Sequence, residues 1–239
     1  MTNFLSRCIL YFTAMVAVLI LGGCATAPQG ERIDSIPMYG QPVIPRPDFL
    51  KKADEDFIKQ AATEFSSREI ASKAWWAQAE KFMSEGNLDY AMRRYNQSWL
   101  LNPDNYQPYW GFGRVMGQRN KLDESIGYLE KAKKLCDDPY QKVALISDLG
   151  AIYSYKASTL PSEKQEEKSR YFELANRHFV DSTNLDPNYS RAWLSWSHSL
   201  YREAKYADAW GKLKKARALG EENIDIFTKN LEQKMPEPK

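Results

Sequence analysis

Apolar residues between about residue 72 and residue 223 recur at intervals of three and four, in blocks separated by short polar turns. Such intervals place the apolar side chains on one face of a helix. The pattern repeats after 34 residues, and each copy predicts a pair of antiparallel helices. The first copy has Trp75, Ala79, Phe82, Ala91, Tyr95, Ser98, Leu101 and Pro103, and the second has Tyr109, Gly113, Met116, Ser125, Leu129, Ala132, Leu135 and Asp137. A fourth copy has Trp193, Ser197, Leu200, Ala209, Leu213, Ala216 and Leu219.

The third copy carries the same pattern in two halves that are out of phase by thirteen residues, at about 157–169. We therefore expect both of its helices to be lengthened. Ser162-Glu163-Lys164-Gln165 has the composition of a capping box, which favours a helix start. The charged stretch 163–170 predicts a solvated turn that projects from the array, with a docking knob as the alternative. The four copies then cover about 72–105, 106–139, 143–189 and 190–223.

Both ends of the array carry signals for additional helices. A helix is expected over residues 53–65, and the capping-box sequence Ser66-Ser67-Arg68-Glu69 follows it. Gly220 ends the last repeat, and a further helix is expected over residues 224–235. Because a stack of helix pairs needs covered ends, we predict that these helices cap it. Residues 236–239 are expected to fray.

The spacing of these residues resembles the tetratricopeptide repeat, which has a large residue at position 4, small residues at positions 8, 20 and 27, and proline at position 32. The resemblance implies an all-α superhelix of antiparallel helix pairs with flanking cap helices. It further implies that segments of other proteins bind along the concave surface, on first-helix positions 2, 5, 9, 12 and 13. The candidate groove residues carried over in this way are Trp76, Trp110, Arg114, Gln118, Tyr155, Arg191, His198, Tyr201 and Arg202.

The two groove tryptophans have a second interpretation. Trp76 and Trp110 are typical of binding hot spots, but they could equally pack into the neighbouring repeat or lie under the N-terminal segment. Chaperone-binding members of the family need Lys and Asn where this chain has Trp76 and Glu80. Chaperone tails are therefore not expected partners.

The charge of the chain is nearly balanced, with 33 Lys and Arg against 31 Asp and Glu. Nucleic-acid binders usually concentrate a basic excess on one face, so we expect no nucleic-acid partner. His178 and His198 are the only histidines, no Cys or His cluster has metal-ligand spacing, and there is no glycine-rich phosphate loop. We therefore expect no enzyme activity, metal, cofactor or small-molecule substrate. At its groove position, His198 could tune binding with pH.

The first residues differ from the rest of the chain, with a mainly apolar, uncharged run from Cys8 to Leu21. This run is short for a membrane span of about 20 residues and fits an export signal. Leu21-Gly22-Gly23-Cys24 resembles the lipobox of bacterial lipoproteins, which implies removal of residues 1–23 and acylation of Cys24. An uncleaved anchor is the alternative. By the same resemblance, Ala25 favours the periplasmic face of the outer membrane.

Residues 24–52 show no helical periodicity, and prolines recur at 28, 37, 42, 45 and 47. Proline fixes φ and lacks an amide hydrogen, so we expect a disordered tether between lipid and array. Apolar pieces at 36–39 and 43–45 leave contact with the folded domain or with a partner open. With Cys24 acylated, Cys136 is the remaining thiol of the mature chain. We expect it to be buried, with a disulfide between chains as the alternative.

Together these patterns predict a non-catalytic, lipid-anchored scaffold or adaptor that binds other envelope proteins through its concave groove. Two alternatives stay open. One is an assembly factor, similar to the pilotins, for an outer-membrane secretin, pilus or secretion complex. The other is a structural oligomer in which arrays stack end to end through the cap formed by Ile224 to Leu231. The pattern names no partner, because repeat arrays share a scaffold while their surfaces diverge.

Overall fold

The computed structural model describes residues 32–222 and 224–238. Every element described below belongs to one compact unit, residues 33–239. The export signal, the lipobox and the expected acylation site Cys24 lie outside the described residues. Within the described ranges, no helix combines the length and the apolar character that crossing a bilayer requires.

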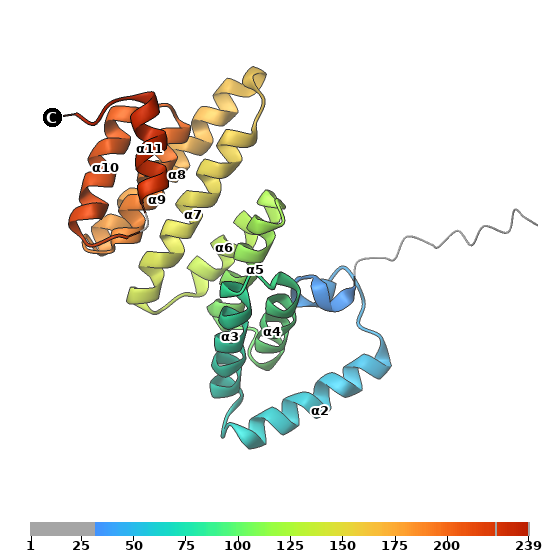
Figure 1. Cartoon of the computed structure of the whole chain (residues 1–239). Helices are drawn as coiled ribbons and strands as arrows, with labels where there is room; N and C mark the ends of the chain where they lie inside the picture. Colours follow the sequence, from blue (N-terminus) through green and yellow to red (C-terminus); the bar gives the residue numbers. More distant parts are fainter. Residues whose placement is uncertain (1–31, 223, 239) are drawn as a thin grey trace, which may run out of the picture. The chain divides into compact units, whose positions relative to one another are not determined.

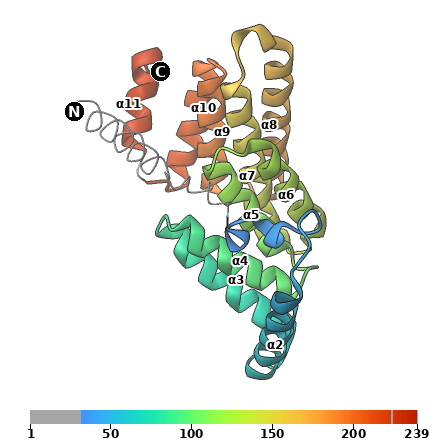
Figure 2. The ribbon, with the colours of Figure 1, turned by 90° about the vertical axis from the view of Figure 1, so that its right-hand side faces the viewer.

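Ten α-helices follow one another in the described chain, which contains no β-strand (Figure 1). They form consecutive antiparallel pairs, α3 with α4, α5 with α6, α7 with α8 and α9 with α10, and neighbouring pairs pack on one another (Figure 2). The predicted all-α array of helix pairs is thereby confirmed. The helices are α2 (Asp48–Glu64), α3 (Arg68–Ser84), α4 (Leu88–Leu101), α5 (Tyr106–Gln118), α6 (Leu122–Leu135), α7 (Pro139–Thr159), α8 (Gln165–Leu185), α9 (Ser190–Arg202), α10 (Tyr206–Ala218) and α11 (Asp225–Lys234).

The helix pairs close on small residues at the positions that the repeat pattern marked. In the second pair, the Ser125 hydroxyl donates to the Gly113 carbonyl at 2.7 Å, and a β-carbon on Gly113 would lie 2.5 Å from Leu129 Cγ. In the fourth pair, the Ser197 hydroxyl donates to the Ala209 carbonyl at 2.7 Å. Larger residues at these crossing points would force the helices apart.

The third pair is longer than the others. Helices α7 and α8 have 21 residues each, whereas the helices of the other pairs have 13 to 17. The predicted capping box at 162–165 does not form, because a 3-10 turn, η3 (Ser162–Lys164), follows Pro161 and α8 starts without a side-chain cap. The residues from 163 to 170 are mainly exposed, which agrees with a solvated projection.

The first helices of three pairs end in the same way. One residue adopts a left-handed backbone at equivalent positions, namely Gly86 (φ 73°), Asn120 (φ 60°) and Ala204 (φ 61°). The amide of the next residue then donates to the carbonyl five positions earlier, at 2.9 Å in all three pairs. Glycine and asparagine adopt this backbone readily, whereas the β-carbon of alanine makes it unfavourable.

The segment before α2 corrects the expectation of a disordered tether for residues 33–47. It forms two 3-10 turns, η1 (Ile33–Ser35) and η2 (Pro37–Gly40), that pack on α4. The buried amide of Asn96 donates to the Ile36 carbonyl at 2.8 Å, and Tyr39 is 8% exposed. The apolar residues at 36–39 bury against α4, and Asn96 satisfies backbone groups that the turns leave unpaired. Residues 24–31 lie outside the described ranges.

Both expected cap helices are present. Helix α2 begins before the expected residue 53, and Phe57 contacts Trp75 of α3 with ring centroids 5.6 Å apart. The cap of α3 lies one residue later than the predicted box, since Ser67 accepts from the Ile70 amide at 3.2 Å.

Helix α11 buries its apolar face on the fourth pair. Phe227 and Leu231 belong to a cluster with Trp210 and Leu213. The chain itself covers this face, so end-to-end stacking through the cap, which stays a prediction, would use the exposed side of α11. The tail after α11, for which we expect fraying, contacts α10: Trp210 Nε1 donates to the Met235 carbonyl at 2.9 Å, and Glu237 lies 3.5 Å from Arg217.

Cys136 lies at the end of α6 and is 3% exposed. Burial raises the pKa of its thiol, and its Sγ lies 3.5 Å from the Asp138 carbonyl oxygen. A disulfide between chains needs an accessible thiolate, so this alternative is excluded for the folded protein.

Candidate functional site

A cavity of about 320 Å³ opens where α5, α7 and α9 present their inner faces. Four of the nine candidate groove residues line it: Arg114 and Gln118 from α5, Tyr155 from α7 and Arg202 from α9. Its apolar walls are Met83, Leu129, Ala151 and Ile152. The repeat spacing thus brings together side chains that are up to 88 positions apart, because successive first helices lie side by side.

One edge of the cavity is held by an ion pair between the first two repeats. Arg114 Nη1 on α5 lies 2.6 Å from Glu80 Oε2 on α3. The Tyr95 hydroxyl donates to the other oxygen of Glu80 at 2.5 Å, and burial together with the Glu80 charge raises the pKa of Tyr95. Arg114 is therefore fixed in position by the protein itself rather than free for a ligand to orient.

Asp148 of α7 is a cavity residue that the groove positions did not include. It accepts from Trp110 Nε1 at 2.8 Å, and burial raises the pKa of its carboxyl in spite of the nearby Arg114 guanidinium. The sequence does hold a signal for it, since Asp148 is the single charged residue between Val143 and Tyr155. A lone carboxylate on an apolar face generally has a specific partner.

The two groove tryptophans are half-buried and pack against the main core cluster. Trp110 donates a hydrogen bond to Asp148 of the next repeat. This agrees with the alternative interpretation, in which Trp110 packs into the neighbouring repeat. The indole nitrogen of Trp76 is buried and has no hydrogen-bond partner in the described chain. Neither tryptophan lines the cavity. Their rings support the groove rather than stand free in it.

Helix α11 covers part of the inner face of the fourth repeat. The His198 ring lies 3.8 Å from the Phe227 ring, and Tyr201 also contacts Phe227, at 5.7 Å. Burial, followed by the charge of Arg202, lowers the pKa of His198 to about 4. With this pKa the ring is neutral near pH 7, so a change of its charge that could tune binding falls in more acidic solution.

The remaining candidate groove residues lie in or beside a second cavity. His198, Tyr201 and Arg202 line a second cavity of about 380 Å³ beside α11, and Arg191 is exposed but lines neither cavity. Arg202 belongs to both cavities. Its guanidinium donates to Ser154 Oγ at 3.5 Å and forms no ion pair within the described residues. Arg202 is thus the groove cation that is best able to pair with a carboxylate of a bound segment.

The groove combines cationic, polar and apolar side chains. Among the described residues, no group of His, Cys, Asp and Glu side chains has the arrangement of a metal site. Both histidines have pKa values lowered by burial, and neither lies beside a nucleophile in the groove. The cavity offers guanidinium groups, a phenol, an amide and apolar walls, which suit a peptide side chain and its backbone.

No family model matches the chain, and no curated protein matches it. Among solved structures, it is similar to the pilF protein of Pseudomonas aeruginosa, with 17% identity and a TM-score of 0.51 over 78% of this chain and 86% of that one. It is also similar to YrrB, which is described as a TPR protein with an unusual peptide-binding site, with 18% identity and a TM-score of 0.48 over 74% of this chain and 81% of that one. The likeness to the pilF protein shows that the two chains share their fold.

Proposed function

We propose that this protein is a non-catalytic interaction scaffold, lipid-anchored in the cell envelope, that binds a segment of a partner protein in the cavity between α5, α7 and α9. The observation that carries this proposal is Arg202, a groove cation without an ion-pair partner in the described chain, at the mouth of an apolar-walled cavity. A carboxylate of the partner would pair with it, and an apolar side chain would fill the space beside Ile152.

The pre-formed wall of the cavity supports the same proposal. The Glu80–Arg114 ion pair and the Trp110–Asp148 hydrogen bond fix three successive first helices relative to one another. Binding to a fixed surface loses less conformational entropy than binding to a mobile one. The groove can therefore hold a short segment without rearranging.

The membrane attachment rests on the lipobox resemblance at Cys24. We propose that acyl chains on this cysteine hold the protein at the periplasmic face of the outer membrane. Metabolic labelling with an alkyne-bearing palmitate should label the wild-type protein and leave Cys24→Ala unlabelled. Equal labelling of both proteins would refute acylation at this position.

A photo-crosslinking amino acid at Gln118, which is exposed and lines the cavity, tests the groove in intact cells. We expect discrete adducts that are lost when Arg202→Glu is added. The matched control is Arg177→Glu, which makes the same charge change on the 71%-exposed side chain of α8 and should leave the adducts intact. Adducts that persist with Arg202→Glu, or no adducts at all, would contradict the proposal.

The identity of the captured protein separates the scaffold role from its alternative. A secretin or pilus subunit as the partner, together with missing multimers in a deletion strain, would make the protein an assembly factor similar to the pilotins. Several envelope enzymes or wall-remodelling proteins as partners would make it an adaptor. Unchanged secretin and pilus multimers in the deletion strain would remove the assembly role.

A further inference from the structure

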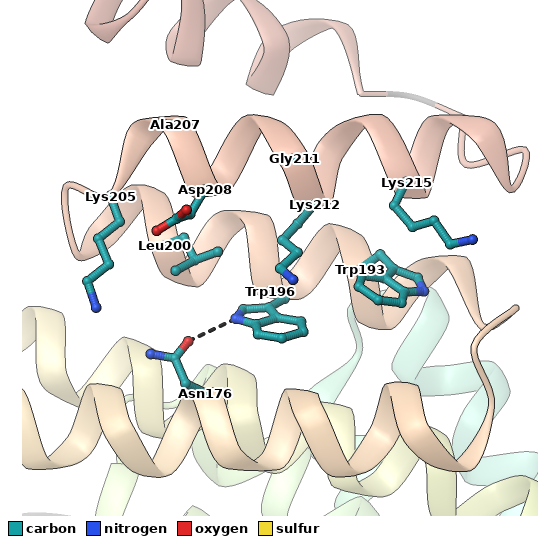
Figure 3. A pocket seen from close by; sticks show the side chains of 10 residues that line it. All are labelled: Asn176, Trp193, Trp196, Leu200, Lys205, Ala207, Asp208, Gly211, Lys212 and Lys215. Atoms are coloured by element: carbon teal, nitrogen blue, oxygen red, sulfur yellow. Dashed lines mark hydrogen bonds between the residues drawn. The ribbon is translucent and has the colours of Figure 1, made fainter. Parts of the chain in front are cut away.

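A larger cavity, of about 550 Å³, lies away from the groove, between α8 and α10 with α9 as its floor (Figure 3). Trp193, Trp196 and Leu200 of α9 line it. These residues are three and four positions apart and share one face of α9, whereas the groove residues His198 and Tyr201 lie on another. We call this cavity the lysine–tryptophan cleft.

The floor of the cleft is a fixed aromatic surface. The rings of Trp193 and Trp196 are stacked with centroids 5.8 Å apart, and Trp196 also stacks on Phe179 at 6.2 Å. Trp193 Nε1 donates to the Pro187 carbonyl at 2.9 Å, and Trp196 Nε1 donates to Asn176 Oδ1 at 2.8 Å. Both indole donors are thus used within the protein, so the rings offer a ligand mainly apolar surface.

Lysine ammonium groups from α10 reach over this floor, as Figure 3 shows. Lys212 Nζ lies 3.6 Å from the Trp196 centroid and 5.2 Å from that of Trp193, and Lys215 Nζ lies 6.0 Å from the Trp193 centroid. Neither ammonium has a carboxylate at ion-pair distance in the described chain, although Asp208 also lines the cleft. Burial lowers the pKa of Lys212, as expected for a cation that lacks a strong partner.

We propose that the lysine–tryptophan cleft binds an extended acidic peptide segment of a partner protein, with carboxylates on Lys212 and Lys215 and an apolar side chain on the two indoles. The cleft-lining residues of α10 run from Ala207 to Lys215, a rise of about 12 Å. An extended peptide of about four residues spans this length. The side chains of such a peptide alternate, so that every second one meets the cleft.

The hydrogen-bonding groups of the cleft favour a peptide over an anionic sugar. Sugar hydroxyls need several free planar donors and acceptors. The indole nitrogens are engaged, Asn176 donates to Glu203 while it accepts from Trp196, and Lys205 pairs with Glu203 at 2.5 Å. What stays available is two cations, the carboxylate of Asp208 and an aromatic surface. The proposal goes beyond the groove function, because the two sites lie on different faces of α9 and do not share lining residues.

Fluorescence anisotropy on the full chain in detergent tests the cleft, with the fluorescein-labelled pentapeptide glutamate–serine–leucine–serine–glutamate as the probe, because an extended backbone then turns both carboxylates and the leucine to the same face. We expect saturable binding that weakens with added salt. The charge reversal Lys212→Glu with Lys215→Glu should weaken it by about tenfold or more. The matched control, Lys229→Glu with Lys234→Glu on the exposed side of α11, should bind as the wild type does. Equal helical circular dichroism of all variants will show that the fold is kept.

Three results would overturn the proposal: no saturable binding to the wild type, equal binding to the Lys212/Lys215 variant, or loss of binding with Arg202→Glu, which would place the peptide in the groove. Neutral replacements, Lys212→Gln with Lys215→Gln, give a second test if the charge reversal disturbs folding, and the same loss of affinity is expected. A fourth such result would be saturable binding of a labelled glucuronate oligosaccharide that displaces the peptide from the wild type and is itself lost in the Lys212/Lys215 variants, which would assign the cleft to anionic sugars.

Discussion

The second and the fourth helix pairs are built on one pattern but present different inner faces. Each pair is closed by one serine hydroxyl on a carbonyl at 2.7 Å, donated by Ser125 of α6 in the second pair and by Ser197 of α9 in the fourth. The second pair leaves Gln118 exposed in the groove, whereas in the fourth pair Phe227 of α11 covers His198. The contacts inside a pair thus determine the fold, and the element packed on its inner face determines whether that face can bind.

The largest effect is expected inside the second pair. Gly113→Val would place a β-carbon 2.5 Å from Leu129 Cγ and 3.2 Å from the Ser125 carbonyl oxygen. Leu129 is fully buried and the Ser125 oxygen belongs to the backbone of the partner helix, so urea unfolding should show a loss of about 3 kcal/mol. The control is Gly127→Ala on the exposed side of α6, which has no atom within 4 Å and should gain up to about 1 kcal/mol. A loss of less than about 1 kcal/mol for Gly113→Val would show that the helices can separate freely.

Helix α11, which packs on the fourth pair, is expected to contribute a similar amount to the free energy of unfolding. Phe227 is 8% exposed and contacts both His198 and Tyr201, so Phe227→Ala should cost about 3 kcal/mol in the free energy of unfolding. Ile226 is 78% exposed beside it, and Ile226→Ala should cost less than about 0.5 kcal/mol. Equal losses for the two variants would mean that α11 is not docked on the fourth pair.

Lowering the pH is expected to have a smaller effect on the free energy of unfolding, and this effect comes from the fourth pair. The pKa of His198 is about 4 in the folded chain against an ordinary value of 6.5, so the unfolded chain takes up the proton first. Its contribution to stability is therefore complete above pH 6.5 and is lost as pH falls to about 4. The loss is on the order of 2 kcal/mol after allowance for partial exposure. His198→Gln should flatten the dependence of unfolding free energy on pH in this window, whereas an unchanged slope would contradict the burial of His198.

The sequence pattern predicted correctly those features that depend on residues three or four positions apart in one helix. The small residues at 113 and 125 follow from a local spacing, and so do the helix pairs that they close. The contact of residues 33–40 with α4 could not be found in this way. It depends on Asn96 meeting the carbonyl of Ile36, a residue 60 positions away, and no periodicity links the two. The sequence pattern also does not show that α11 covers His198. The pattern predicts a capping helix, but it does not predict which face of the fourth pair that helix covers.

The smallest effect on the free energy of unfolding is expected in the turns that end the first helices of the two pairs. Asn120 in the second and Ala204 in the fourth adopt nearly the same left-handed backbone, with φ of 60° and 61°. Alanine pays for this backbone with its β-carbon, so Ala204→Gly should raise the free energy of unfolding by about 1 kcal/mol. Gly86 holds the equivalent position in the first pair with no atom within 4 Å of an added β-carbon, and Gly86→Ala should cost a similar amount. Because Gly86 has open space around it, the stability lost in Gly86→Ala measures backbone strain alone. If Ala204→Gly then shows no gain in stability, contacts of the Ala204 side chain must offset that strain.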